Sequence, residues 1–333
     1  MTRLVALLLL TLSPFGVLAA LNTDGLPAGA AAVIVVDLAA FRSSQLGKAV
    51  EQSASLNTGN NPVNKLMAEK LNFDGNKDLR EIDLAIYPGA DGKLTAKNPT
   101  AALLLRGKID ASRINNFGKD NQVPGKTVGK HQAWEAGVFA EKLFGEKPKD
   151  QTREAYIVAY STELVLITSP DLLAAALASL DANEKNTLLP TATAQQFAAV
   201  SKGWLFAYAD ATKMKTSDTN GATDLTLSLG ENPTDLQLAL AANFVAAEKA
   251  TTIRKQINGL KAFASIGLMN DEGKTPDEKE NMKLIAELVQ KIRIGGDGRT
   301  VTLGLDYAAD KAAQAIVKTI EKAKRPTPAP ASK

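Results

Sequence analysis

Several segments of the chain alternate strictly between large apolar residues and polar or small ones. The clearest lie at residues 82–86, 225–229, 236–240 and 301–305, where isoleucine, leucine or valine fills every second position. A period of two is the pattern of a β-strand with one buried face and one wetter face. It is typical of antiparallel sheets that carry helices on one side. These segments therefore predict antiparallel strands.

Turn-forming residues connect the predicted strands in pairs. Gly230–Pro233 separates strands at 223–229 and 235–243, and Gly295–Gly298 separates 291–295 from 300–307. Ser161–Glu163 separates the apolar runs at 155–160 and 163–168 in the same way. Short links of this composition predict β-hairpins. A further hairpin is expected between 82–87 and 101–106.

Predicted helices follow the hairpins. Asp110 precedes a helical pattern at 111–117, and Ser169-Pro170-Asp171 precedes an Ala-rich run. Aspartate and serine side chains accept hydrogen bonds from the first free N–H groups of a helix, and proline fits the first helical position. Further helices are predicted at 246–262, 276–290 and 308–323, where apolar residues recur at helical spacing.

The two halves of the chain contain the same predicted elements in the same order: strand, helix, hairpin, helix, hairpin, helix. The first strand of each half ends in an aspartate, Asp37 or Asp210, followed by small residues. The first half has extra helical sequence near 45–71 and an insertion near 119–153. We expect an α+β fold of two related lobes, each an antiparallel sheet with helices packed on one face. The repeat would indicate either a ligand cleft between lobes or a duplication that only enlarged a stable fold.

The ends of the chain predict export. Arg3 and the apolar run Leu4–Leu12 are typical of a signal peptide, with cleavage expected after Ala19, or after Ala20. An uncleaved anchor is the alternative, but the run is shorter than the ~20 residues of a spanning helix. The predicted organisation is a signal peptide at 1–19, an N-terminal lobe at 20–186, a C-terminal lobe at 187–324 and a disordered Pro/Ala-rich tail at 325–333. No later segment predicts a membrane span.

The amino-acid composition limits where the protein is expected to be located and which partners it is expected to bind. The chain has no cysteine, so disulfides, thiolate nucleophiles and cysteine-bound metals are excluded. Secreted eukaryotic proteins of this size usually carry disulfides, so an exported chain without cysteine is expected to be bacterial, periplasmic or secreted. The net charge is +3, and lysine and arginine are scattered among acidic residues. Because no basic block is present, no nucleic-acid partner is expected.

The common catalytic and cofactor motifs are absent from the sequence. There is one histidine and no Gly-x-Ser-x-Gly or His-Glu-x-x-His motif. Asp74–Asp78 resembles the start of a calcium loop, but Leu79 and Ala85 occupy the places of the required glycine and glutamate. Gly125-Lys126-Thr127 ends like a phosphate-binding loop without its first glycine. We expect no cofactor, no metal and no catalytic residue among these motifs.

The insertion at 119–153 concentrates aromatic residues and is the strongest candidate for a contact site. It holds His131, Trp134, Phe139 and Phe144 among lysines and glutamates. On one interpretation it is a flap that contacts a ligand or partner through these side chains, with Trp134 at its centre. On the other, the aromatic residues fold back onto the sheet.

The pattern of the chain resembles a broad group of uncharacterised exported bacterial α+β proteins. The similar segments are Val33–Phe41 with Leu46–Ala49, residues 103–117, and the strand–turn–strand–Ser-Pro unit at 155–177. The resemblance covers most of the chain outside the signal peptide, but it implies no activity and assigns no catalytic residue.

The sequence therefore favours an exported protein that binds an unidentified protein or small-molecule ligand without catalysis. Two alternatives stay open. One is a secreted hydrolase that uses scattered carboxylates, which would require polar groups converging in a cleft. The other is a structural component of the envelope. A binder of apolar ligands would instead have a dry pocket between its helices and its sheet.

Overall fold

A computed structural model describes residues 25–58, 62–89, 92, 94, 100–145, 154–183, 203–214, 221–267 and 276–324. The predicted signal peptide, the predicted tail and the boundary expected between the lobes at 186/187 lie outside these residues. No helix in the described part is long and apolar enough to cross a membrane.

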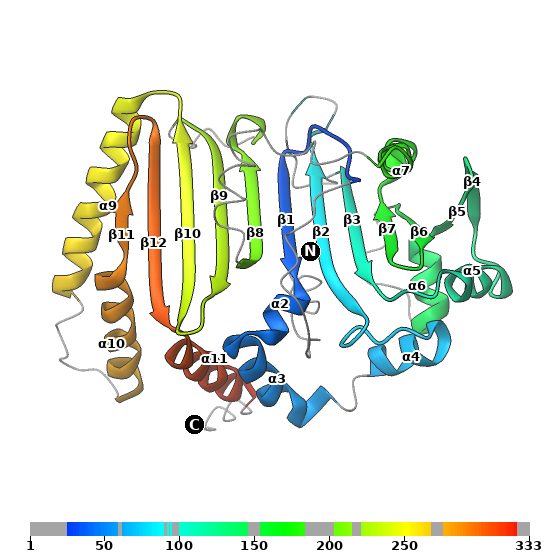
Figure 1. The fold of residues 1–333 in the computed structure, drawn as a ribbon, viewed down its shortest axis with the longest axis horizontal. Helices are drawn as coiled ribbons and strands as arrows, with labels where there is room; N and C mark the ends of the chain where they lie inside the picture. The colour runs from blue at the N-terminus through cyan, green and yellow to red at the C-terminus, as the bar shows by residue number, and fades with distance from the viewer. Residues whose placement is uncertain are drawn as a thin grey trace, which may run out of the picture.

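The described strands form one twelve-stranded antiparallel sheet, so the α+β fold class is confirmed (Figure 1). The strand order is β11-β12-β10-β9-β8-β1-β2-β3-β7-β6-β5-β4. The strands are β1 (Ala32–Asp37), β2 (Leu79–Tyr87), β3 (Thr100–Gly107), β4 (Gly125–Val128), β5 (His131–Glu135), β6 (Tyr156–Ser161), β7 (Leu164–Thr168), β8 (Gly203–Asp210), β9 (Ala222–Glu231), β10 (Asp235–Phe244), β11 (Arg293–Gly295) and β12 (Thr300–Ala308).

The two halves of the chain meet at the centre of this sheet. β1 pairs with β8, and Ile34 lies opposite Ala207. Outward from this pair the order is β1-β2-β3-β7-β6 in one direction and β8-β9-β10-β12-β11 in the other. We call these the first arm and the second arm. The order in which the strands pair is the same in both arms. Two lobes with a sheet each were expected, and in the structure these sheets are joined into one. The duplication itself stays a prediction.

Most of the helices gather around the lower end and the two outer edges of the sheet in Figure 1, and α7 lies near the upper end of β7. The α-helices are α2 (Leu38–Ser43), α3 (Gln45–Thr58), α4 (Pro62–Leu71), α5 (Ala111–Asp120), α6 (Ala136–Phe144), α7 (Leu173–Asp181), α9 (Ala247–Gly267), α10 (Pro276–Lys291) and α11 (Ala309–Lys324). Short 3₁₀ turns, η1 (Pro170–Leu172) and η2 (Ala211–Lys213), precede α7 and follow β8.

The aspartates that end β1 and β8 begin the next helical turn in both arms. Asp37 accepts a hydrogen bond from the N–H of Ala40 at 2.8 Å, and Asp210 accepts one from Thr212 at 3.0 Å. Asp110 caps α5 through the N–H of Arg113 at 2.9 Å, as predicted. Each carboxylate satisfies a donor that the helix itself leaves free. Their role in this structure is to turn a strand into a helix.

The helix cap expected at Ser169 is not present. Ser169 precedes η1, but its side chain makes no capping hydrogen bond. Its hydroxyl instead accepts a hydrogen bond from the N–H of Ala101 at 2.9 Å. Ala101 lies in β3 beside the end of β7, so the hydroxyl extends the pairing of these two strands in place of capping the helix.

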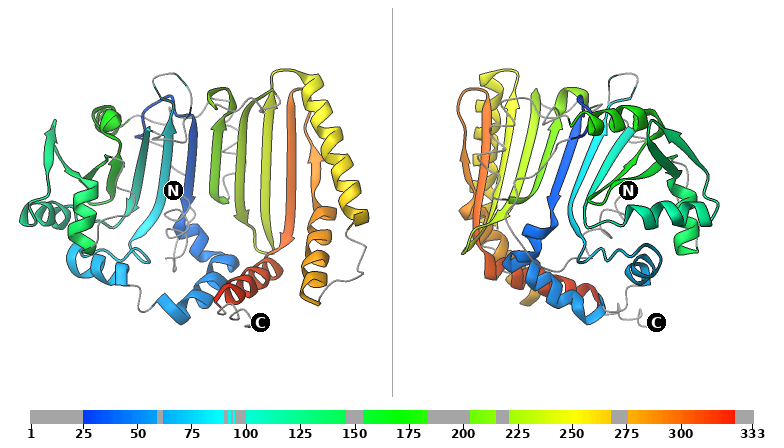
Figure 2. Two further views of the ribbon diagram at one scale, coloured as in Figure 1. Left: turned by 180° about the vertical axis from the view of Figure 1, so that it is seen from behind. Right: turned by 45° about the vertical axis from the view of Figure 1, so that its right-hand side comes forward.

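Most helices pack on one face of the sheet, which we call the helical face. Its strand residues include Val36, Leu105, Leu205 and Val301, and apolar clusters join them to helices at the lower end and at both edges. α7 packs on the opposite face, against a fully buried layer that contains Val33, Val35, Ala85, Leu104 and Leu166. The sheet is strongly bent across its width (Figure 2).

Candidate functional site

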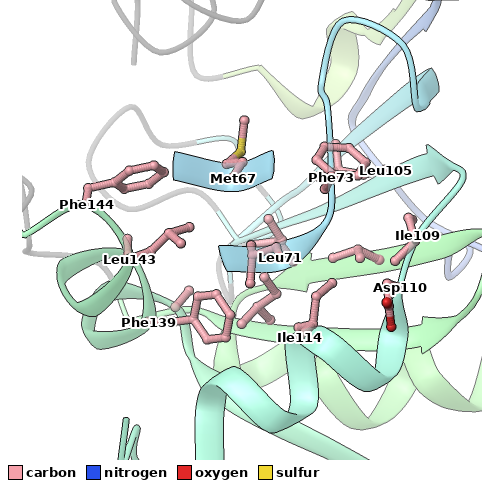
Figure 3. Close-up of a pocket in the computed structure, with 15 residues that line it drawn as sticks. Met67, Leu71, Phe73, Leu105, Ile109, Asp110, Ile114, Phe139, Leu143 and Phe144 are labelled. Atoms are coloured by element: carbon pink, nitrogen blue, oxygen red, sulfur yellow. The ribbon is translucent and has the colours of Figure 1, made fainter. Parts of the chain in front are cut away.

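A cavity of about 240 Å³ lies between the helical face and three helices of the first arm (Figure 3). Its floor is the outer part of the sheet, and its walls are α4, α5 and α6. The apolar side chains that line it are Met67, Leu71, Phe73, Leu105, Ile109, Ile114, Ala136, Phe139, Ala140, Leu143, Phe144, Ile157, Val165 and Ile167.

The lining follows from the periodicity of each element. Met67 and Leu71 are four residues apart in α4, as are Phe139 and Leu143 in α6, so each pair projects from one side of its helix. Val165 and Ile167 alternate along β7, and Ile157 of β6 lies directly opposite Ile167. The apolar sides of these helices and strands therefore all face the cavity.

Polar contacts hold the three helices together at their ends. Lys70 of α4 donates to the carbonyl oxygen of Leu143 in α6 at 3.0 Å. Arg113 of α5 donates to the carbonyl oxygens of Lys70 and Glu69 in α4, both at 3.1 Å. These cations satisfy carbonyl groups that the last turn of a helix leaves free, and they complement its negative end. The helices are fixed around the cavity by contacts at its rim.

The interior of the cavity is apolar. Asp110 is the one charged side chain among its described lining residues, and its carboxylate already caps α5. An ionised group inside such a space would lose its hydration without gaining a partner, which is costly. For scale, an engineered apolar cavity of about 150 Å³ stays dry and binds benzene. The geometry suits an uncharged apolar ligand of greater size.

Two of the four residues predicted to contact a ligand lie at this cavity. Phe139 and Phe144 both line it, and the ring of Phe139 lies 4.9 Å from that of Phe117 between centroids. Phe139 is almost completely buried. Whether either side chain contacts a ligand stays a prediction.

Trp134 lies behind the cavity wall and does not line the cavity. It is buried in the same apolar cluster, and its indole N–H donates to Asn115 of α5 at 3.0 Å. Gly118 of α5 is so close that an added Cβ would lie 2.5 Å from the indole ring. Trp134 thus folds back and fixes α5 against β5.

His131 lies in β5 on the opposite face of the sheet and takes part in a polar cluster. Its Nε2 is 3.0 Å from Asp181, the last residue of α7, and its ring stacks on Tyr160 with 4.8 Å between centroids. Tyr160 and Lys130 also contact Asp181, each at 3.0 Å. Hydrogen bonds from Lys130 and His131 lower the pKa of Asp181 to about 2. The cluster attaches the end of α7 to the sheet.

The motifs that resembled ion sites have structural roles. Asp74 accepts the N–H of Asn76 at 2.9 Å, and Asp78 accepts that of Asp74 at 2.7 Å, so these carboxylates stabilise a turn before β2. The Gly125 segment forms the edge strand β4. Within the described residues, no cluster of three or more His, Asp or Glu side chains could hold a metal ion.

Paired carboxylates occur away from the cavity. Glu81 and Asp83 both contact Nε of Arg106, at 3.1 and 2.8 Å, on the face opposite the helical face. Asp83 is completely buried. These acids form an ion-paired group under the protein surface, and neither lines the cavity in which a hydrolase would need them.

Sequence reasoning missed the residues of α4 and α5 that complete the site. Met67, Leu71 and Ile114 carry no motif, and the one signal was the helical spacing of apolar residues. That spacing shows that a helix has an apolar side, but it does not show which space that side faces.

No family model and no curated protein matches the chain. Among solved structures it is similar to TP0453 in three crystal forms. Form I is 9% identical with a TM-score of 0.43, over 90% of this chain and 98% of that one. Form III is 10% identical with a TM-score of 0.44, over 90% and 99%. Form IV is 8% identical with a TM-score of 0.45, over 90% and 97%.

Proposed function

We propose that this chain is an exported, non-catalytic binding protein of the bacterial envelope that takes up an apolar ligand between α4, α5, α6 and the sheet. The observation that carries the proposal is the lining of the cavity, which is apolar except for a carboxylate already used as a helix cap. The signal-peptide pattern and the absence of cysteine support the location.

The energetics favour uptake of a hydrophobic molecule. Burial of apolar surface contributes roughly 25 cal/mol per Å², and the cavity offers apolar contacts on all its walls. Hydrogen bonds from Lys70 and Arg113 fix the helices that form the walls at their ends. A preformed site reduces the entropy that binding costs.

Filling the cavity tests the proposal. We would titrate the mature protein with the hydrophobic fluorophore N-phenyl-1-naphthylamine and record native mass spectra of gently purified material. Ala140→Phe places a ring in the cavity, and Ala136→Leu fills it less. Ala174→Phe, at an exposed position of α7, is the matched control.

We expect the wild type and Ala174→Phe to bind the fluorophore alike. Ala140→Phe should weaken binding at least tenfold while circular dichroism stays unchanged, and Ala136→Leu should weaken it less. Equal binding by all four proteins would show that the cavity is not the site. A wild type that neither binds the fluorophore nor retains an added mass would reject the proposed function.

A further inference from the structure

A continuous row of apolar side chains crosses the helical face from the cavity to the second arm. Each member lies directly opposite the next in the strand pairing, so the row runs at right angles to the strands. Its members, in order from β6 to β12, are Ile157, Ile167, Leu103, Leu84, Ile34, Ala207, Leu227, Leu240 and Leu303.

The row begins inside the cavity. Ile157 and Ile167 form part of the cavity floor, and Leu103 is the first member beyond the lining. Because Leu103 lies opposite Ile167, no polar side chain interrupts the passage from the floor to the open sheet. The cavity and the row form one apolar surface.

The middle of the row is poorly covered by the described residues. Ile34 is 36% exposed, and Leu84, Leu103 and Leu227 are half-buried. None of these four belongs to an apolar cluster with a described helix. By contrast, Val36 and Leu229, two residues from Ile34 and Leu227 along the same strands, belong to the cluster that contains Leu38 and Phe41 of α2. On the opposite face, Val33 and Val35 are fully buried. A contiguous apolar surface that is partly open to solvent in this way is typical of a binding site.

We infer that the ligand is a lipid with a linear hydrocarbon chain. The end of this chain occupies the cavity, and the rest of the chain lies along the row. The inference rests on the function proposed above and names the class of ligand. Neighbouring strands lie about 4.8 Å apart, so the three spacings from Ile167 to Ile34 span about 14 Å. One lipid chain spans about half of the ~30 Å hydrocarbon core of a bilayer, or roughly 15 Å. A compact ligand would leave the row unused.

Chain length distinguishes the row from the cavity. We would measure displacement of the fluorophore by saturated fatty alcohols of 8, 12 and 16 carbons. The wild type is compared with Leu84→Asn in the row and with Leu260→Asn, a leucine of α9 that is 68% exposed and is not a member of the row. Ile34→Thr is a second row variant that keeps a β-branched residue in the strand.

We expect wild-type affinity to rise at least tenfold from the 8-carbon to the 16-carbon alcohol. Leu84→Asn and Ile34→Thr should lower affinity for the 16-carbon alcohol several-fold and leave the 8-carbon alcohol unaffected. Leu260→Asn should change neither.

The possible failures have different meanings. Suppose that the wild type binds the 8-carbon and 16-carbon alcohols with equal affinity and that Ala140→Phe binds neither. That result would overturn the inference that the ligand lies along the row, and it would support binding in the cavity. A chain-length dependence that is unchanged in both row variants would show that something else covers the row, such as another part of the chain or a protein, and would also overturn it. Absence of binding by every alcohol and by the fluorophore would reject the proposed function itself.

Discussion

The two arms of the sheet have the same strand order but cover their helical faces differently. In the second arm, α9 packs directly on the strands, with Ala250, Ile253 and Ile257 against Phe244 and Val301. In the first arm, α4, α5 and α6 stand around a cavity. The same strand order therefore carries a packed apolar cluster in the second arm and a cavity in the first arm.

The insertion at 119–153 contributes to the difference. It supplies β4 and β5, which have no counterpart in the order of the second arm, and α6, which precedes β6 as α10 precedes β11. α6 contributes Phe139, Leu143 and Phe144 to the cavity wall, and β5 holds Trp134 against α5. The arms share their strand order, so the candidate site arises from the helices and the inserted hairpin that surround it.

The largest effect is expected from removal of a ring in each arm. Phe139→Ala and Phe244→Ala should each lower the free energy of unfolding by about 3–5 kcal/mol, because both rings are buried. Only Phe139→Ala should also weaken fluorophore binding. Urea unfolding and titration measure the two effects. An equal loss of binding in both variants would show that the binding site is not confined to the first arm.

A glycine in a helix of each arm gives a sharper contrast. Gly118→Ala should destabilise the protein by about 1–3 kcal/mol, since its methyl group would overlap the ring of Trp134. Gly259→Ala in α9 has open space, so it should stabilise by roughly 0.5–1 kcal/mol through helix propensity alone. Urea unfolding of both variants measures these changes. A Gly118→Ala variant that is as stable as Gly259→Ala would contradict the described packing of Trp134.

The smallest effect concerns acid stability. The folded-state pKa of Asp181 is about 2, against about 3.9 for an unfolded chain. Its contribution to stability is therefore complete above pH 4 and is lost as the pH falls toward 2. The melting temperature of the wild type should exceed that of Asp181→Asn by no more than a few degrees, and the difference should shrink over that range.

The second arm offers a parallel for this measurement. A hydrogen bond from Arg293 lowers the pKa of Asp306 in β12, so Asp306→Asn should show the same trend. Thermal melts of both variants from pH 7 to pH 2 test this. A difference that grows as the pH falls would show that the carboxylate is not ion-paired in the folded protein.

The fold was largely predictable because its signals are local. Alternation at 82–86 and 301–305 predicts strands, and the residues of the turns between strands predict their pairing. Asp110 also acts within three residues of its own position. Ser169 was misjudged because its partner, Ala101, is distant in sequence and is brought near only by the pairing of β3 with β7.

The candidate site was less predictable because its parts are distant in sequence. Aromatic enrichment indicated the insertion, and Phe139 and Phe144 lie at the cavity. His131 belongs to the same insertion but lies on the other face of the sheet, because it is an odd number of residues from Trp134 along β5. Met67 and Ile114 face the same space although they are distant in sequence, and Arg113 joins their helices through the carbonyl oxygen of Lys70.

The pairing of β1 with β8 also bears on how the chain folds. β1 must wait for a partner that follows most of the first arm in sequence, although each hairpin beside it can form from neighbouring residues. Contacts across long stretches of chain are slow to form. Until β8 arrives, the first arm has an open, Val- and Ile-rich strand at its edge, which is prone to pair with other chains. While the chain is being synthesised, a chaperone that covers this edge would prevent such pairing.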